Sequence, residues 1–153
     1  MSAKEETLVS LAHALVTLCR EKKLRFTTAE SCTGGLIASC VTAVSGASCV
    51  FEGAFVTYTP ELKMRLLSVR EETVHKEGVV SHTCAREMAL GAQKASGADL
   101  SVSVTGYAGP TGGTEEDPVG TVYFGISTRG ELQSVRRVFS GTRNEVRSKA
   151  AAF

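Results

Sequence analysis

The sequence lacks the cysteine patterns of metal-binding and disulfide-stabilised proteins. It has five cysteines, none of them in a C-x-x-C pair and none near a histidine at the spacing of zinc ligands. We therefore expect no metal and no other cofactor. An odd number of unpaired cysteines is typical of reduced thiols, so we expect a cytoplasmic protein. The five are Cys19, Cys32, Cys40, Cys49 and Cys84.

Charge and hydropathy argue against two further classes of protein. Seventeen Lys and Arg residues nearly balance sixteen Asp and Glu residues, which leaves a net charge of +1 and argues against a nucleic-acid-binding face. No apolar run approaches the ~20 residues that a membrane helix needs. The N-terminus also lacks the charged-then-apolar pattern of a secretory signal. We expect neither a nucleic-acid partner nor a membrane partner.

Several common catalytic motifs are also missing. There is no G-x-x-x-x-G-K-[ST] loop, no G-x-G-x-x-G after a strand, no G-x-S-x-G turn and no H-E-x-x-H helix. Three histidines are present, and nothing in their spacing ties His75 or His82 to a nucleophile. A Ser/His/Asp triad is therefore unsupported by the sequence.

Helical and strand patterns alternate along the 153 residues, which we interpret as one domain, residues 1–153. Helical spacing predicts helices over 3–22, 36–44, from Pro60 and over 82–96, and Thr142 is a candidate cap for a last helix. Strand patterns cover 25–29, 50–58, 100–105, 121–128 and 131–139. This order favours an α/β fold with a mixed, mostly parallel sheet covered by helices on both faces.

The most informative stretch is residues 28–35, with the sequence TAESCTGG, at the junction between a strand and a helix. Such a junction places Ser31 beside the free N–H groups of a helix N-terminus, which suit an oxyanion or a phosphate. Cys32 is an alternative nucleophile, because helix N-termini favour thiolates. Composition alone also fits a plain strand-to-helix turn, with Ser as a cap and Gly relieving strain.

Two residues could activate Ser31. Tyr58 ends the second strand, and Lys63 follows in the next helix. Either residue can act when its proton affinity is shifted by its surroundings. Taken alone, the tyrosine is typical of packing and the lysine of a solvated surface. In a sheet covered on both faces, however, the carboxyl ends of parallel strands meet in one crevice, so Ser31, Tyr58 and Thr105 are expected there.

A glycine-rich loop follows the third of these strand ends. Residues 106–118 contain four glycines and two prolines, and loops this long within a domain are often functional. Its simplest interpretation is a flexible lid or a surface turn. Its alternative role is a backbone cradle for an anionic ligand.

Taken together, these segments resemble the CinA C-terminal domain, the nicotinamide mononucleotide deamidase family. The resemblance rests on residues 29–35, on 51–58 with Lys63, on 104–110 and on 118–122, with a weaker fifth segment at 141–143 with Arg147. It runs from about residue 6 to the last residue. Tyr107 departs from the small aliphatic residue common in the family, which leaves the shape of the pocket wall open.

The resemblance implies a three-layer α/β/α sandwich that hydrolyses the carboxamide of nicotinamide mononucleotide, giving nicotinic acid mononucleotide and ammonia. It makes Ser31 the nucleophile and makes Tyr58 and Lys63 its proton-transfer partners, with no metal. The resemblance is also compatible with a homo-oligomer. The backbone N–H groups of 33–35 are expected to hold the oxyanion, and the 106–114 loop and Arg143 are expected to hold the phosphate. The expected substrate-binding residues are Glu30, Cys32, Thr33, Gly34, Gly35, Thr105, Gly106, Gly109, Gly112, Gly113 and Arg143.

Two other functions stay open at this point. The chain could be a nucleotide-binding or regulatory module that keeps the pocket without turning substrate over. It could also be a hydrolase in which Cys32 is the nucleophile and His82 its base.

Overall fold

The computed structural model describes the backbone of residues 3–153 and the side chains of residues 7–153. Its centre is a five-stranded sheet in the order β2-β1-β3-β4-β5. The two pairings of β1, with β2 and with β3, are parallel, whereas β3–β4 and β4–β5 are antiparallel. The sheet is mixed as expected, but parallel pairs do not predominate among the described strands. The strands are β1 (Phe26–Glu30), β2 (Phe51–Val56), β3 (Leu100–Gly106), β4 (Thr121–Ser127) and β5 (Leu132–Val138).

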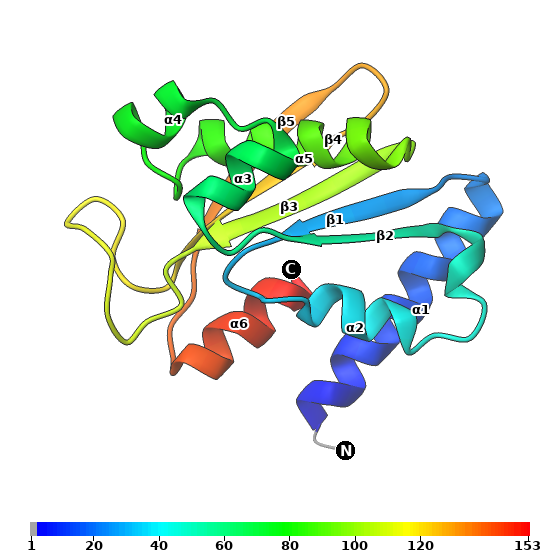
Figure 1. Ribbon diagram of the computed structural model, residues 1–153. Coiled ribbons are helices and arrows are strands. Elements are labelled where there is room, and N and C mark those ends of the chain that lie inside the picture. The colour runs from blue at the N-terminus through cyan, green and yellow to red at the C-terminus, as the bar shows by residue number, and fades with distance from the viewer. Residues whose placement is uncertain (1–2) are drawn as a thin grey trace.

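Helices cover both faces of this sheet, so the three-layer α/β/α arrangement is confirmed (Figure 1). On one face lie α3 (Pro60–Leu67), α4 (Glu71–Lys76) and α5 (His82–Ser96), and on the other lie α1 (Ala3–Lys22), α2 (Leu36–Thr42) and α6 (Arg143–Ala152). None of the described helices is long and apolar enough to span a bilayer. A single 3-10 turn, η1 (Ala47–Cys49), precedes β2.

Local sequence explains where α3 and α5 begin. Thr59 accepts a hydrogen bond from Leu62 N, and Pro60 follows in the first turn of α3. Ser81 caps α5 in the same way, through Cys84 N. The short helix α4 is missing from the sequence prediction. It has no side-chain cap, and its six residues are too few for a clear helical period.

Alternation along the strands decides which side chains face each helical layer. Ala29 of β1 is fully buried in one cluster with Leu67, Cys84 and Met88, under α3 and α5. Phe26 instead joins Val16 and other residues of the α1 and α2 layer. Because neighbours in a strand point to opposite faces, two separate cores lie on the two sides of the sheet.

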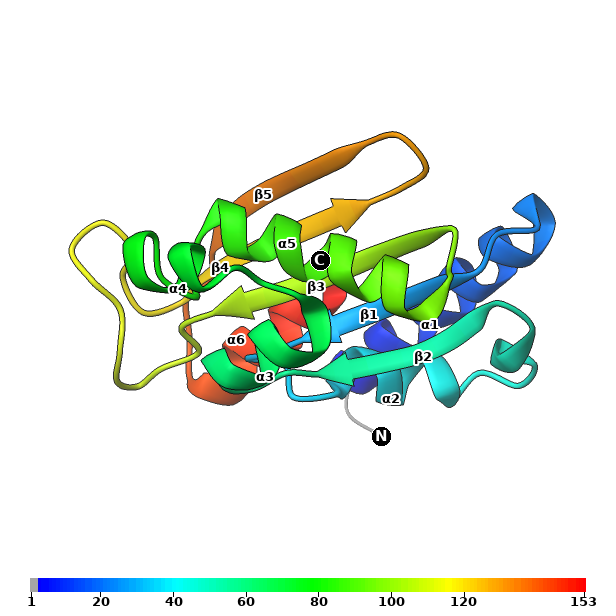
Figure 2. The same ribbon diagram turned by 45° about the horizontal axis from the view of Figure 1, so that its top comes forward.

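The parallel strands β1 and β3 end at the same edge of the sheet, and the long loop after β3 lies there too (Figure 2). The chain leaves β1 through the 31–35 turn into α2 and leaves β2 into α3. The start of α6 reaches the same edge. Ser31, Tyr58 and the 106–114 loop therefore lie at one end of the sheet, as the parallel-strand argument predicts.

Candidate active site

The site centres on a direct contact between Ser31 and Lys63. Ser31 follows the last residue of β1, and its backbone N–H donates to Val104 O of β3 at 2.9 Å. Lys63, in the first turns of α3, extends its amine to the same point. Lys63 Nζ donates to Ser31 Oγ at 2.9 Å and to Thr57 O at 2.6 Å. Two residues 32 positions apart in the sequence thus share a hydrogen bond at the edge of the sheet.

Lys63 is buried, with 1% of its surface exposed. Burial lowers the pKa of its amine, because removal from water disfavours the charged form. The opposing effects come from the Cys84 and Cys32 thiols. Among the ion pairs of the described side chains, none involves Lys63. Without a carboxylate to hold its charge, this lysine is suited to act as a neutral base.

Glu30 ends β1 with its side chain on the α2 face and is fully buried. Its carboxylate accepts backbone N–H groups of Gly35 at 3.0 Å, Ile37 at 3.2 Å and Ala38 at 2.9 Å. It also accepts the Thr33 hydroxyl at 2.7 Å. The negative charge therefore lies at the N-terminus of α2, where the helix leaves donors unsatisfied. The Glu30 carboxylate and the Thr33 hydroxyl are therefore both hydrogen-bonded within the protein.

The backbone of the 31–35 turn needs glycine at two positions. Gly34 and Gly35 have φ of 62° and 92°, in the left-handed region that glycine adopts without strain. The N–H of Gly34 donates to Ser31 O at 3.0 Å, and that of Gly35 donates to Glu30. Two of the donors expected to hold an oxyanion are thus already paired inside the turn. The amides of Cys32 and Thr33 donate to no backbone oxygen in the described part of the chain, and both lie beside the Cys32 thiol.

Tyr58 lies at the same edge of the sheet, but its hydroxyl contacts a different partner. The ring is 56% exposed, and its hydroxyl accepts Arg143 Nη2 at 2.8 Å. Arg143 Nη1 also donates to Gly109 O at 2.8 Å. The guanidinium therefore joins the end of β2, the glycine-rich loop and the start of α6. Among the hydrogen bonds of the described side chains, none joins the Tyr58 hydroxyl to Ser31 or Lys63.

The glycine-rich loop after β3 is partly built into the fold. The Thr105 hydroxyl is buried and donates to Val79 O at 2.7 Å. Gly106 allows close strand packing, since a Cβ there would lie 2.5 Å from Thr121 O. Gly112 is exposed and Gly113 half-buried, with φ of 93° and 84°. Of the expected ligand contacts in this loop, the 112–113 backbone is the part nearest to solvent.

The structure does not bring together the alternative pair of Cys32 and His82. Burial raises the pKa of the Cys32 thiol to about 11, and neighbouring backbone N–H groups and the charges of Lys63 and Arg147 offset this only in part. His82 Nδ1 lies 2.9 Å from Ser134 Oγ, and its ring packs edge-on against Tyr123 at 4.7 Å. A protonated thiol and a histidine engaged elsewhere do not form a nucleophile–base pair.

Two residues at this edge were absent from the predicted set. Thr57 is fully buried, and its Oγ1 has no partner among the described residues, although its carbonyl holds Lys63. Alternation from Phe55 places Thr57 on the face that Lys63 covers, so the sequence held a usable signal.

Arg147 of α6 donates to Cys32 O at 3.2 Å and to Thr33 O at 2.9 Å. That contact joins residues more than 110 positions apart, and no local pattern predicts it.

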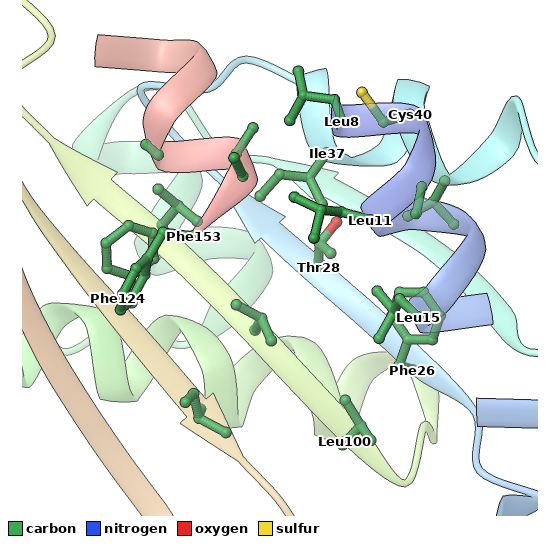
Figure 3. A pocket seen from close by; sticks show the side chains of 18 residues that line it. Leu8, Leu11, Leu15, Phe26, Thr28, Ile37, Cys40, Leu100, Phe124 and Phe153 are labelled. Atoms are coloured by element: carbon green, nitrogen blue, oxygen red, sulfur yellow. The ribbon is translucent and has the colours of Figure 1, made fainter. Parts of the chain in front are cut away.

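A cavity of about 330 Å³ lies away from this edge, between α1, α6 and the face of the sheet that these helices cover (Figure 3). Leu8, Leu11 and Leu15 line it from α1, and Phe124 and Phe153 lie across from them with ring centroids 4.7 Å apart. Its lining is almost wholly apolar. Thr28 and Cys40 also line it, whereas Ser31 and Lys63 do not, so this cavity is separate from the site.

Comparison with known proteins identifies the family of this chain. The family model of the CinA C-terminal domain matches residues 8–153, and the chain belongs to that family. A nicotinamide-nucleotide amidohydrolase, PncC, of Escherichia coli strain K12 is 46% identical over 150 residues, which are 97% of this chain and 91% of that protein. A putative competence-damage inducible protein of Caldicellulosiruptor saccharolyticus is 48% identical over 145 residues, but these cover 35% of that longer protein.

Solved structures show the same fold. A CinA superfamily protein from Escherichia coli has a TM-score of 0.93 at 36% identity, covering 99% of this chain and 88% of that chain. A competence/damage inducible protein from Agrobacterium tumefaciens has a TM-score of 0.91 at 40% identity, covering 95% and 90%. These values extend the family assignment from sequence to the whole α/β/α arrangement.

Proposed function

We propose that this chain hydrolyses the carboxamide of nicotinamide mononucleotide to nicotinic acid mononucleotide and ammonia, with Ser31 as nucleophile and Lys63 as its base. The contact between a buried lysine amine and Ser31 Oγ at 2.9 Å carries the assignment of these two roles. The choice of substrate rests on the 46% identity to the Escherichia coli nicotinamide-nucleotide amidohydrolase.

In the first half of the reaction, Ser31 Oγ attacks the amide carbon. Neutral Lys63 keeps its hydrogen bond to Thr57 O and uses its lone pair to accept the serine proton. A general base positioned in this way contributes about 10²–10⁴ in rate. The amides of Cys32 and Thr33 are the candidate oxyanion donors, and one such donor contributes roughly 3–4 kcal/mol.

In the second half, the C–N bond breaks and Lys63 returns its proton to the leaving nitrogen, which departs as ammonia. The product is an ester between Ser31 and the nicotinoyl group. Water then attacks this ester with Lys63 again as the base, which releases the carboxylic acid and restores the serine. Each turnover consumes one water and forms one ammonia, so the reaction needs no redox partner.

The remaining predicted residues are proposed to act at the phosphate end of the substrate. Arg143 is exposed and already spans the site mouth from Tyr58 to Gly109. The backbone of Gly112 and Gly113 lies in the same loop. A guanidinium and a glycine backbone are both suited to a phosphate. The proton-transfer role of Tyr58 stays a prediction of the family resemblance.

Ammonia release from nicotinamide mononucleotide tests the function. We expect the wild-type chain to release ammonia and Ser31→Ala to lose at least 10³-fold in kcat, as a missing nucleophile does. Cys32→Ala is the matched control and should keep activity within threefold. Full activity in Ser31→Ala would overturn the nucleophile assignment. Binding of the nucleotide by wild-type protein without ammonia release would favour the non-catalytic module instead.

Two further expectations remain proposals. The cytoplasmic location follows from the free cysteines, and the homo-oligomer follows from the resemblance. Fractionation of cells and light scattering of the purified chain test them directly.

A further inference from the structure

We propose that Arg147 is a positioning residue that orients the backbone donors next to Ser31, an inference that rests on the proposed function. Its guanidinium reaches from α6 to the 31–35 turn and donates from Nε to Cys32 O at 3.2 Å and from Nη2 to Thr33 O at 2.9 Å. These are the carbonyls of the two residues that follow the nucleophile.

Peptide planarity turns this carbonyl contact into control of the amides. In a trans peptide, the C=O of one residue and the N–H of the next point in opposite directions. With the Cys32 carbonyl held on Arg147, the Thr33 N–H is directed away from α6. With the Thr33 carbonyl held there, the Gly34 N–H is directed away as well, and it donates to Ser31 O. Arg147 thereby fixes both peptide units from their carbonyl side.

The charge of Arg147 adds to this geometric effect. A cation at the carbonyl end polarises the peptide unit and strengthens the hydrogen bond that its N–H donates. The contact is close on the turn side as well, since a Cβ on Gly34 would lie 3.6 Å from Arg147 Nη2. The Thr33 N–H donates to no backbone oxygen among the described residues and lies beside the Cys32 thiol, so Arg147 acts on one of the two proposed oxyanion donors.

The helix that holds Arg147 is well anchored. Thr142 accepts Glu145 N, and the Glu145 side chain accepts Thr142 N, which forms a complete capping box at the start of α6. Val146 and Ala150 are each 1% exposed and bind the helix to the core beside Cys32. The cap and these buried residues therefore hold the backbone that carries Arg147 next to Cys32.

Steady-state kinetics of Arg147→Ala on nicotinamide mononucleotide test the proposal. We expect kcat to fall about 10–300-fold, because misplacing one oxyanion donor has an effect that approaches its removal. KM should stay within threefold of the wild-type value. Guanidinium chloride at tens of millimolar should restore part of kcat in this variant but not change that of wild type. Lys149→Ala is the matched control, because Lys149 Nζ donates to Ser140 O at 2.6 Å from the same helix, away from the turn. Its kcat should equal that of wild type.

A second readout separates this inference from the proposed function. A fluorophosphonate labels an activated serine without needing the nucleotide, and we expect Arg147→Ala to react at least tenfold more slowly than wild type and Lys149→Ala. If wild type releases no ammonia, the labelling rates still decide the role of Arg147. Unchanged labelling and kcat would overturn the proposal. So would a rise in KM alone, which indicates substrate binding, or a kcat loss that only follows loss of folded protein by circular dichroism.

Discussion

Lys63 Nζ lies 2.9 Å from Ser31 Oγ, and both groups are nearly removed from solvent. Burial lowers the pKa of the amine, so its neutral form is populated at lower pH than for a surface lysine. We expect kcat/KM to rise with pH through this lowered pKa and then to level off. A profile of kcat/KM from pH 5 to 10 checks it. A rate that is flat on the acidic side would contradict Lys63 as the base.

The same pKa shift predicts a pH-dependent stability effect. Between the lowered pKa of the folded state and the ordinary pKa of the unfolded chain, the unfolded state binds an extra proton, so folding becomes more favourable as pH rises. Lys63→Met removes this dependence. The unfolding free energy of the variant relative to wild type should therefore be highest at and below the lowered pKa of folded Lys63, and fall by about 1.4 kcal/mol for each pH unit between that pKa and the ordinary lysine pKa. Urea unfolding of both proteins at a series of pH values from neutral up to the ordinary lysine pKa of about 10.4 measures the trend, and a constant difference across the series would contradict it.

Glu30 is predicted to matter for folding more than for chemistry. Its buried carboxylate accepts three backbone N–H groups of the α2 start, and Glu30→Gln would place an amide NH₂ against some of these donors. We expect a loss of about 2–4 kcal/mol in unfolding free energy, or roughly 5–15 °C in Tm. Glu52→Gln, which breaks only the exposed pair with Arg25, is the control and should shift Tm little. An unchanged Tm for Glu30→Gln would contradict the capping role.

The contact between Tyr58 and Arg143 predicts that their substitutions are coupled. Because the hydroxyl of Tyr58 accepts Arg143 Nη2, Tyr58→Phe and Arg143→Gln each remove the same hydrogen bond. The double variant should lose less than the product of the two single losses in kcat/KM. We also expect Tyr58→Phe to retain more kcat than Lys63→Met, since only Lys63 contacts Ser31. A Tyr58→Phe variant as inactive as Lys63→Met would instead support a direct proton-transfer role for Tyr58.

Gly91 allows α5 to pack closely against α3, the helix that carries Lys63. A Cβ at this position would lie 1.9 Å from Leu67 O at the end of α3, where neither backbone can easily give way. We expect Gly91→Ala to destabilise the fold by about 2–3 kcal/mol and to lower kcat through displacement of Lys63. Thermal unfolding and ammonia release measure both effects. Ala95→Ser, at an exposed position of the same helix, should match wild type in each.

Much of the fold followed from local patterns. The period of the helices, the strand over β3 and the caps Ser81 and Thr142 are properties of neighbouring residues, and the structure confirms them. Two features did not follow. The short helix α4 has no capping side chain, and the count of parallel and antiparallel pairs depends on strand order, which the chain does not display locally.

For the site, the sequence by itself determined which chemical groups are present and that they lie near strand ends. A serine, a lysine and two glycines at such positions follow from composition and period alone. Only the tertiary structure decided how they are used. Burial of the Lys63 amine against Ser31 and Thr57 turns a surface-type lysine of α3 into a candidate base, and Glu30 takes up donors expected for the ligand. Arg147 joins the turn from the far end of the chain. Burial and long-range contact depend on how distant segments pack, and a reading of neighbouring residues does not contain that information.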